Sequence, residues 1–316
     1  MKKIVVFLLL ISMVLIGFVG CGEKKEESAS KEVNNKVVEE KESASKSSEE
    51  KTNGTNISTK KELSGTISIV GSTSVAPLAE KLAEEFKSLN PKVKVEIQAV
   101  GSTAGVKAAK DKTGQIGMAS RNLKTEEEEW NLTKHIIAYD GIAVVVNPSN
   151  DISELSKEQV KKIFKGEITN WNEVGGKDEA ILVVSRESGS GTRGAFEDIV
   201  SLKEKVEING EMKKVSQVRE DALIADGNGV VMANIASKDN AVGYVSLSYV
   251  DGTVKSLKID GEDATVENIQ KDKYKISRPF LMLTNGEMDD VTKEYIDFVF
   301  SDKGQEIVSL KNISVK

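Results

Sequence analysis

The sequence predicts an α/β fold of two units, each with a mainly parallel β-sheet flanked by helices. Short apolar segments that read as strands alternate with segments whose apolar residues recur at helical spacing, a pattern typical of parallel sheets. In such sheets, ligands bind at the carboxyl ends of the strands. Three of the strands also run into loops rich in Gly, Ser and Thr that open directly into a helix. These loops are residues 71–74, 101–103 and 186–192.

The first part of the predicted fold begins after a polar N-terminal segment. Apolar residues of 75–89 fall at helical spacing, and Asn90 followed by Pro91 ends that helix. Thr125 is expected to cap a short helix, and glutamates 126–129 are expected to form a solvated turn that complements its dipole. The expected elements are strand 66–70, helix 75–89, strand 93–100, helix 104–110, strand 115–119, the helix after Thr125 and strand 136–146.

The second part continues the alternation after Asn147 and Pro148, which end the long apolar strand. Glycines of residues 227–229 precede another helix, and two helical segments close the chain. The expected elements are helix 156–164, a turn at 169–176, strand 181–185, helix 192–200, helix 230–237, strand 241–246 and helices 295–300 and 304–310.

Residues 1–20 predict an export signal. Two lysines precede an apolar run, residues 4–19, that is short for a membrane-spanning helix. The segment resembles a bacterial lipoprotein signal peptide, in which cleavage before the Cys leaves a thiol for diacylglycerol attachment. Phe18 departs from the Leu that is usual there. The resemblance implies that Cys21, the single cysteine, is a lipid anchor on the extracytoplasmic face of the membrane; a retained signal-anchor helix is the alternative.

The next segment predicts a tether. Residues 22–60 are rich in Lys, Glu, Ser and Asn, and they contain no Leu and no aromatic residue, so they cannot bury a core. A flexible coil of about 39 residues spans roughly 35 Å root-mean-square. We therefore expect residues 21–62 to be the lipidated Cys and a disordered tether that lets the folded part reach a partner in the same membrane.

The composition excludes several function classes. A net charge of −6 argues against nucleic-acid binding, and an anionic ligand would have to be attracted by local dipoles and a few arginines. One Cys and one His rule out an internal disulfide and leave little basis for a Cys/His zinc site. His135 lies at the entry to a strand, where a structural role is expected. The composition does not favour an enzyme, and no cofactor or metal is expected.

The third Gly/Ser loop carries two superficial motifs. Residues 189–194 spell G-x-G-x-x-G, but the charged stretch after Val200 does not supply the second strand and acid of a dinucleotide fold. A nucleophile elbow around Ser190 lacks its flanking glycines, and the Lys and acid of phosphoryl transfer are missing. Binding of a small anion without chemistry is the better interpretation.

Several stretches together carry a family resemblance. They occur in order at residues 71–77, 101–105, 117–121, 168–176, 185–193 and 243–245. They closely resemble the phosphate-binding lipoproteins of bacterial phosphate ABC importers, the PstS family, over essentially all of residues 63–316. The resemblance implies a two-lobed periplasmic-binding-protein clamp that holds dehydrated phosphate between the lobes.

The strand pattern and the resemblance give expected lobe boundaries. The first lobe is expected to comprise residues 63–145 and 250–316, and the second residues 146–249. Hinges are expected near residues 143–148 and 246–253, where the chain would cross between the lobes.

The resemblance also implies a phosphate shell of hydroxyl, N–H and guanidinium donors, which suits an oxyanion. Arg193 is left open between a ligand contact and a lobe-closing salt bridge. The implied ligand residues are Thr73, Ser74, Ser102, Ser120, Arg186, Ser190, Gly191 and Thr192.

Two departures from the family matter. Its best-known members carry an Asp where this chain has Arg121, and that Asp accepts the phosphate proton and so excludes sulfate. If Arg121 faces the ligand, it adds a cationic clamp, and Asp140 in the apolar strand is our candidate acceptor; a turn or hinge role is the alternative for Asp140. Ser188 stands where some relatives carry an acid that locks the ligand Arg, and Glu187 could replace that acid.

The leading hypothesis is a monomeric, lipid-anchored receptor that captures inorganic phosphate and delivers it to an ABC permease in the cytoplasmic membrane. A receptor for another tetrahedral oxyanion, such as sulfate, is the first alternative. A secreted phosphatase or esterase, and an adhesion or sensing protein that has kept the fold, are the others.

Overall fold

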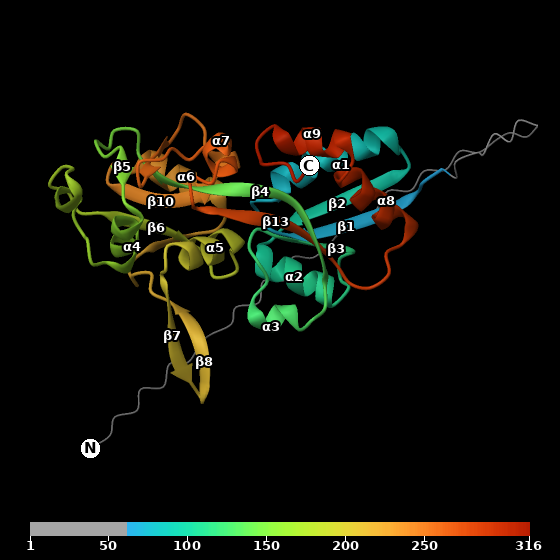
Figure 1. Ribbon diagram of the computed structural model, residues 1–316, viewed down its shortest axis with the longest axis horizontal. Helices are drawn as coiled ribbons and strands as arrows, with labels where there is room; N and C mark the ends of the chain where they lie inside the picture. Colours follow the sequence, from blue (N-terminus) through green and yellow to red (C-terminus); the bar gives the residue numbers. More distant parts are fainter. Residues whose placement is uncertain (1–61) are drawn as a thin grey trace, which may run out of the picture. The chain divides into compact units, whose positions relative to one another are not determined.

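The computed structural model describes residues 62–316. The expected export signal, the lipidation site Cys21 and the tether up to residue 61 lie outside the described residues. Strands and helices alternate along the described chain (Figure 1). The first elements are β1 (Gly65–Gly71), α1 (Ala76–Leu89), β2 (Val93–Ala99), α2 (Ser102–Lys110), β3 (Ile116–Ala119), α3 (Thr125–Glu128), β4 (Thr133–Val146), β5 (Glu154–Leu155), α4 (Lys157–Lys165) and the 3₁₀ helix η1 (Trp171–Val174).

The remaining elements include several that the sequence analysis did not expect, among them a β-hairpin and a late strand. They are β6 (Leu182–Arg186), α5 (Gly191–Ile199), β7 (Lys203–Ile208), β8 (Glu211–Ser216), β9 (Leu223–Ala225), α6 (Asn228–Ser237), β10 (Ala241–Ser246), η2 (Leu247–Tyr249), β11 (Lys255–Ser256), β12 (Lys258–Ile259), α7 (Val266–Gln270), β13 (Ser277–Thr284), α8 (Asp290–Val299) and α9 (Asp302–Ser309).

The main sheet confirms the predicted α/β class. Its strand order is β2-β1-β3-β13-β4-β10-β6-β9, and β11 pairs with β4. The outer strands pair in parallel, as β1 does with β2 and β3, and as β6 does with β9 and β10. The two central strands, β13 and β4, are antiparallel to each other and to their neighbours.

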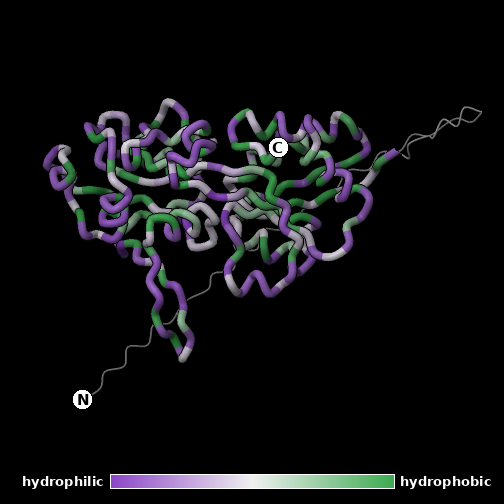
Figure 2. The backbone as a smooth tube through the Cα atoms, in the orientation of Figure 1, coloured by the Kyte–Doolittle hydropathy of each residue, from purple (hydrophilic) through white to green (hydrophobic). Residues whose placement is uncertain are grey.

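The described chain has two main hydrophobic cores. One is built from residues before 139 and after 279, and the other from residues 142–276. We call residues 62–140 and 278–316 lobe I, and residues 142–276 lobe II. In Figure 2 the hydrophobic stretches follow the inner strands, and hydrophilic positions follow the outer turns.

The core places the lobe boundary later in the chain than residue 249, where the sequence analysis expected it. Val254, Leu257 and Tyr274 are buried in the lobe II core, because the short strands β11 and β12 and helix α7 pack there. The chain therefore crosses between the lobes in β4 and at the start of β13, not near residues 246–253. This late strand β13 supplies Arg278, which the sequence analysis did not single out.

An ion pair joins the two crossing strands. Asp140 on β4 lies opposite Arg278 on β13, and Arg278 Nη2 donates to Asp140 Oδ2 at 2.7 Å, with both side chains at least 98% buried. Ser246 Oγ donates to the same oxygen at 2.8 Å, and Asn312 Nδ2 donates to Oδ1 at 3.1 Å. Burial raises the pKa of Asp140 against the opposing effect of Arg278.

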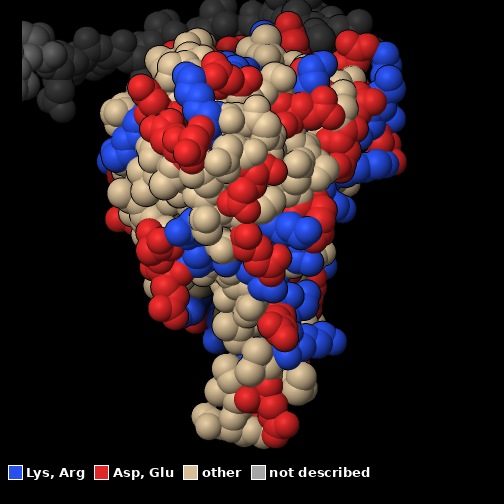
Figure 3. All heavy atoms as spheres, turned by 90° about the vertical axis from the view of Figure 1, so that its left-hand side faces the viewer, with Lys and Arg blue, Asp and Glu red and all other residues tan. Residues whose placement is uncertain are grey.

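The unexpected hairpin explains the charged stretch after Val200. Strands β7 and β8 pair antiparallel, and Asn209 and Gly210 between them both have positive φ. Asn-Gly is the preferred sequence for such a two-residue turn. Figures 1 and 3 show the hairpin projecting from lobe II with charged side chains of both signs along it. This mixture of Lys and Glu keeps its open strand edges polar.

Candidate anion-binding site

Polar residues of both lobes meet where parallel strands end. This edge of the sheet is where a ligand is expected in such a fold. The residues are Ser72, Thr73 and Ser74 after β1, Ser102 after β2, Ser120 after β3, Arg186 at the end of β6, and Asn228 after β9.

Three helices begin at this edge without a side-chain cap. Among helices of eight or more residues in the described chain, α4, α5, α8 and α9 have a Ser or Asp side chain that caps the N-terminus. The N-termini of α1, α2 and α6 have none. The positive dipole ends of these three helices therefore remain suited to an anion. At α1 the N–H groups of Ala76, Leu78 and Ala79 already donate to the carbonyl oxygens of Ser72 and Val75, and Pro77 has no N–H.

Arg186 is the buried cation of the site. Its side chain is 1% exposed, and its Nε and Nη2 each donate to a carboxylate oxygen of Glu187 at 2.7 Å. Nη1 donates to Asn228 Oδ1 at 3.2 Å, and Nη2 also donates to Thr73 Oγ1 at 3.1 Å. The expectation that Glu187 holds the arginine is confirmed.

Hydrogen bonds join the lobes around Ser74. Its Oγ lies 2.7 Å from Thr192 Oγ1 and accepts from Asn228 Nδ2 at 3.0 Å. Tyr249 Oη in lobe II donates to the carbonyl oxygen of Thr73 in lobe I at 2.8 Å. These bonds bring the loop after β1 against α5, α6 and η2.

A glycine is required where α5 meets the serines of lobe I. Ser72 Oγ donates to Ser120 Oγ at 2.9 Å, and Ser102 Oγ accepts from Ser120 N at 3.0 Å. A Cβ added to Gly191 would lie 2.1 Å from Ser102 Oγ and 2.6 Å from Ser120 Oγ. The N-terminus of α5 can approach lobe I this closely only because residue 191 has no side chain.

Arg121 does not provide the cationic clamp that was considered for it. Its Nη1 and Nη2 donate to the two carboxylate oxygens of Glu127 at 2.6 and 2.8 Å, and both side chains are buried. Glu127 is therefore not part of a solvated turn, contrary to the expectation for residues 126–129. Its pKa is lowered, because the bonds from Arg121 and the N–H of Lys124 outweigh the effect of burial. Thr125 is the first residue of α3, not its cap.

Arg193 takes neither of the two roles left open for it. Its Nε donates to Glu197 one helical turn later, and its Nη1 donates to the carbonyl oxygen of Arg186, both at 2.7 Å. Both partners belong to lobe II, so Arg193 braces the strand end that carries Arg186. Ser190 caps α5, because its Oγ accepts from Arg193 N at 3.1 Å.

Asp140 is linked to the site through Ser246, whose N–H donates to Asn228 Oδ1 and whose Oγ donates to Asp140 Oδ2. Its two oxygens accept from Arg278, Ser246 and Asn312, and these contacts do not support the expectation that it accepts a ligand proton. These contacts agree with the alternative of a hinge residue, because Asp140 lies where the chain crosses between the lobes. It lies in strand β4, however, and not in a turn.

Two residues of the site were missed. Asn228 and Tyr249 both bridge the lobes, and the only sequence signal for Asn228 was its place between two glycines before a helix.

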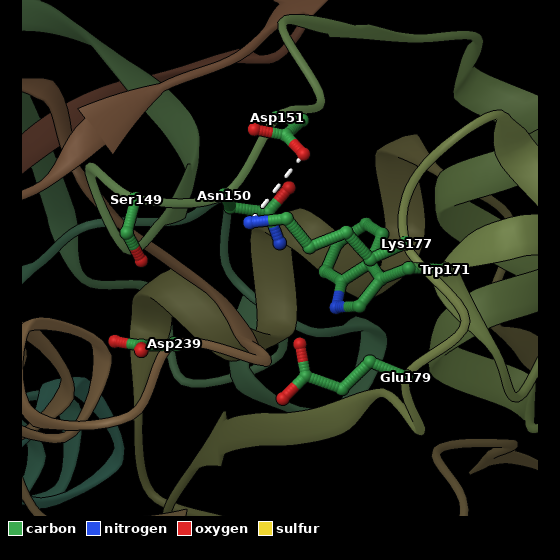
Figure 4. A pocket seen from close by; sticks show the side chains of 7 residues that line it. All are labelled: Ser149, Asn150, Asp151, Trp171, Lys177, Glu179 and Asp239. Carbon is green, nitrogen blue, oxygen red and sulfur yellow. Dashed lines mark ion pairs between the residues drawn. The ribbon is translucent and has the colours of Figure 1, made fainter.

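A separate surface pocket of about 120 Å³ on lobe II does not suit an anion. Figure 4 shows three carboxylates around it, from Asp151, Glu179 and Asp239, and Lys177 forms an ion pair with Asp151 at 3.4 Å. Like charges would repel an anionic ligand there. Trp171 also lines the pocket; it is buried, and its indole N–H donates to the carbonyl oxygen of Asn240.

His135 has a structural contact. Its Nε2 lies 3.0 Å from Thr284 Oγ1 on the neighbouring strand β13, and burial lowers its pKa. Within residues 62–316, no helix is both long and apolar enough to cross a membrane.

Comparisons with known proteins found similar sequences over most of the chain. A family model described as a PBP superfamily domain matches residues 39–303. The phosphate-binding protein PstS of Bacillus subtilis is 32% identical over 263 residues, covering 82% of this chain and 83% of that protein. PstS of Borreliella burgdorferi is 31% identical over 249 residues, covering 77% and 87%.

Two solved structures are also similar to this chain. A putative phosphate ABC transporter substrate-binding protein with bound phosphate from Clostridium perfringens is 44% identical with a TM-score of 0.75, covering 80% of this chain and 100% of that one. An ABC-type phosphate transport receptor from Vibrio cholerae is 38% identical with a TM-score of 0.67, covering 79% and 100%.

Proposed function

Because this chain belongs to the PBP superfamily and, within it, to the PstS family of phosphate-binding proteins, we propose that it captures inorganic phosphate between its lobes and delivers it to an ABC permease. The observation that carries the proposal is the meeting of three uncapped helix N-termini with the buried Arg186. Each helix end supplies about half a positive charge.

The ligand shell of the proposal follows from these contacts. Phosphate oxygens accept from hydroxyls, helix-terminal N–H groups and the guanidinium, and Ser190 contributes by capping α5. Asn228 joins the shell as the residue that orients Ser74. The proposed shell is Thr73, Ser74, Ser102, Ser120, Arg186, Gly191, Thr192 and Asn228.

Capture requires the lobes to separate and close. The two crossing strands, β4 and β13, are the proposed hinge, because the chain changes from one hydrophobic core to the other within them. The bonds from Asn228 and Tyr249 to the loop after β1 would form on closure and break on release.

The cellular setting is part of the proposal. The export signal and Cys21 support a lipid anchor on the extracytoplasmic face, with the tether giving reach toward a permease. The solved relatives from Clostridium perfringens and Vibrio cholerae are both named as proteins of phosphate ABC transport. We propose a monomer that binds without turnover, since the relatives are named as binding proteins and His135 is paired with a threonine.

Titration calorimetry of the full chain in detergent, freed of co-purified anion, tests the proposal. Phosphate is expected to bind tightly with one site per chain, and a chromogenic phosphate ester is expected to remain intact. Absence of phosphate binding, or turnover of the ester, would contradict the proposal.

Tyr249→Phe is expected to weaken phosphate binding about two- to tenfold, since a neutral hydrogen bond contributes about 0.5–1.5 kcal/mol. The lost bond joins the lobes and exists in the closed form. Tyr274→Phe is the matched control, because Tyr274 Oη donates to the carbonyl oxygen of Ile142 at the same 2.8 Å but within lobe II. If both variants lose the same phosphate affinity, the bond from Tyr249 to the loop after β1 does not specifically stabilise the closed form.

A further inference from the structure

Three glycines of lobe II face lobe I. They are Gly189 in the loop before α5, Gly191 at the first position of α5 and Gly194 three residues later. The carbonyl oxygen of Gly189 accepts from Thr103 N of lobe I at 3.1 Å. Gly191 and Gly194 lie on the same face of the helix, because residues three apart are neighbours on a helix surface. Gly191 meets the serines of the site, whereas Gly194 meets a residue that the proposed shell does not include.

The residue opposite Gly194 is Arg121. A Cβ added to Gly194 would lie 3.1 Å from Arg121 Cδ and 3.8 Å from Arg121 Nε, and outside α5 it would meet no other heavy atom within 4 Å. Arg121 Nη2 also donates to Thr103 Oγ1 at 3.4 Å, and the N–H of the same threonine reaches Gly189. The Arg121 side chain is therefore part of the lobe I surface on which α5 rests.

Arg121 is held in this position from within lobe I. Its Nη1 and Nη2 donate to the two carboxylate oxygens of Glu127 at 2.6 and 2.8 Å, and Nη1 also donates to the carbonyl oxygen of Asn122 at 2.9 Å. A bidentate pair of this kind fixes the plane of the guanidinium. Both partners belong to lobe I, so neither contact requires the lobes to be closed.

The pair also lowers the cost of bringing α5 onto this surface. Arg121 is 5% exposed, and an arginine buried there alone would lose its hydration without compensation. It would also lie beside the first turn of α5, where the helix dipole is positive. Burial acts against ionisation of Glu127, but the bonds from Arg121 and from the N–H of Lys124 outweigh it and lower the pKa of Glu127. The carboxylate thus balances the charge of Arg121 inside lobe I.

We propose, on the basis of the proposed function, that Arg121 is a positioning residue for lobe closure. Fixed by Glu127, its side chain forms the surface on which α5 comes to rest at Gly194 when phosphate is bound. Arg121 then acts on phosphate affinity through the closed form, without touching phosphate. A brace that served lobe I alone would leave phosphate affinity independent of the side chain at residue 194.

Gly194→Ala tests the proposal, because its two expected effects have opposite signs. Alanine in place of glycine stabilises a helix, so the thermal stability of the ligand-free chain is expected to equal or exceed that of the parent. The added methyl group meets Arg121 only when the lobes are closed. Phosphate affinity is therefore expected to fall about five- to tenfold, the lower end of the range for overpacking. Thermal unfolding without phosphate and calorimetry of the full chain in detergent with phosphate measure the two effects.

The matched background combines Arg121→Ala with Glu127→Ala, which removes the surface and leaves no unpaired buried charge. Here the methyl group at residue 194 has no side chain to meet, so adding Gly194→Ala is expected to change phosphate affinity by less than about twofold. Such non-additivity identifies a direct contact between the two positions. If the double replacement does not fold, Gly194→Ala alone still tests the contact.

The other outcomes are distinguishable. Parent-like phosphate affinity in Gly194→Ala, or the same loss in both backgrounds, would overturn the inference and leave the proposed function standing. A fall in ligand-free thermal stability together with the loss of affinity would also overturn the inference, because the methyl group would then disturb lobe II itself. Absence of phosphate binding in the parent would overturn the proposed function and the inference with it.

Discussion

Arg186→Ala is expected to weaken phosphate binding by about a hundredfold or more. Arg186 is buried and holds Glu187, Thr73 and Asn228 at once. Its removal takes away the cation and leaves the Glu187 carboxylate facing the anion. Truncating one partner of a buried, hydrogen-bonded charge pair costs about 2–5 kcal/mol, and each 1.4 kcal/mol is a factor of ten in affinity.

Calorimetry with phosphate measures this effect, with Arg219→Ala as the control. Arg219 also lies in lobe II and also pairs with a nearby carboxylate, that of Asp221, but Asp221 is exposed. Arg186→Lys is expected to bind nearly as weakly as the alanine variant, since an ammonium cannot hold Glu187, Thr73 and Asn228 together. If the phosphate affinity of Arg186→Ala lies within about threefold of the parent's, Arg186 does not contribute to phosphate binding as proposed.

Gly191→Ala is the second change with a large expected effect. Its backbone suits alanine, because residue 191 is the first residue of α5 and does not have a positive φ. The added methyl group would meet Ser102 and Ser120 of the opposite lobe at 2.1 and 2.6 Å. Each lobe can fold as before, but the closed contact between them cannot form. Overpacking of about 1–3 kcal/mol corresponds to a loss of about five- to 150-fold in affinity.

The sequence predicted the parts of the site that are local in the chain. Gly/Ser loops after strands, Arg186 at a strand end and Glu187 beside it are close in sequence, so their geometry follows from the turn and the helix start. The α/β class was predicted because short apolar segments typical of strands alternate with segments whose apolar residues recur at helical spacing.

The errors arose where a side chain finds its partner in another segment. Arg121 pairs with Glu127 and Asp140 pairs with Arg278, and the second pairing depends on the register of β13, a strand that was not recognised. The late lobe boundary has the same cause, since residues 254–276 return to lobe II through very short strands.

One missed element did carry a local signal. Asn209-Gly210 marks a two-residue hairpin turn between β7 and β8, but the Lys- and Glu-rich flanks obscured the strand pattern. Asn228 and Tyr249 had no comparable signal, because their roles depend on contacts with the other lobe.

The central claim is that phosphate is held between lobes that close on it, and the comparison of Gly191→Ala with Gly189→Ala tests this claim most directly. Gly189 lies in the same loop, and a Cβ there would meet nothing within 4 Å. Calorimetry of both variants and the parent is expected to show parent-like phosphate affinity for Gly189→Ala and a loss of at least about fivefold for Gly191→Ala, with equal thermal stability without ligand. Parent-like affinity in Gly191→Ala would contradict the account, because phosphate would then bind without closure of the lobes at this contact.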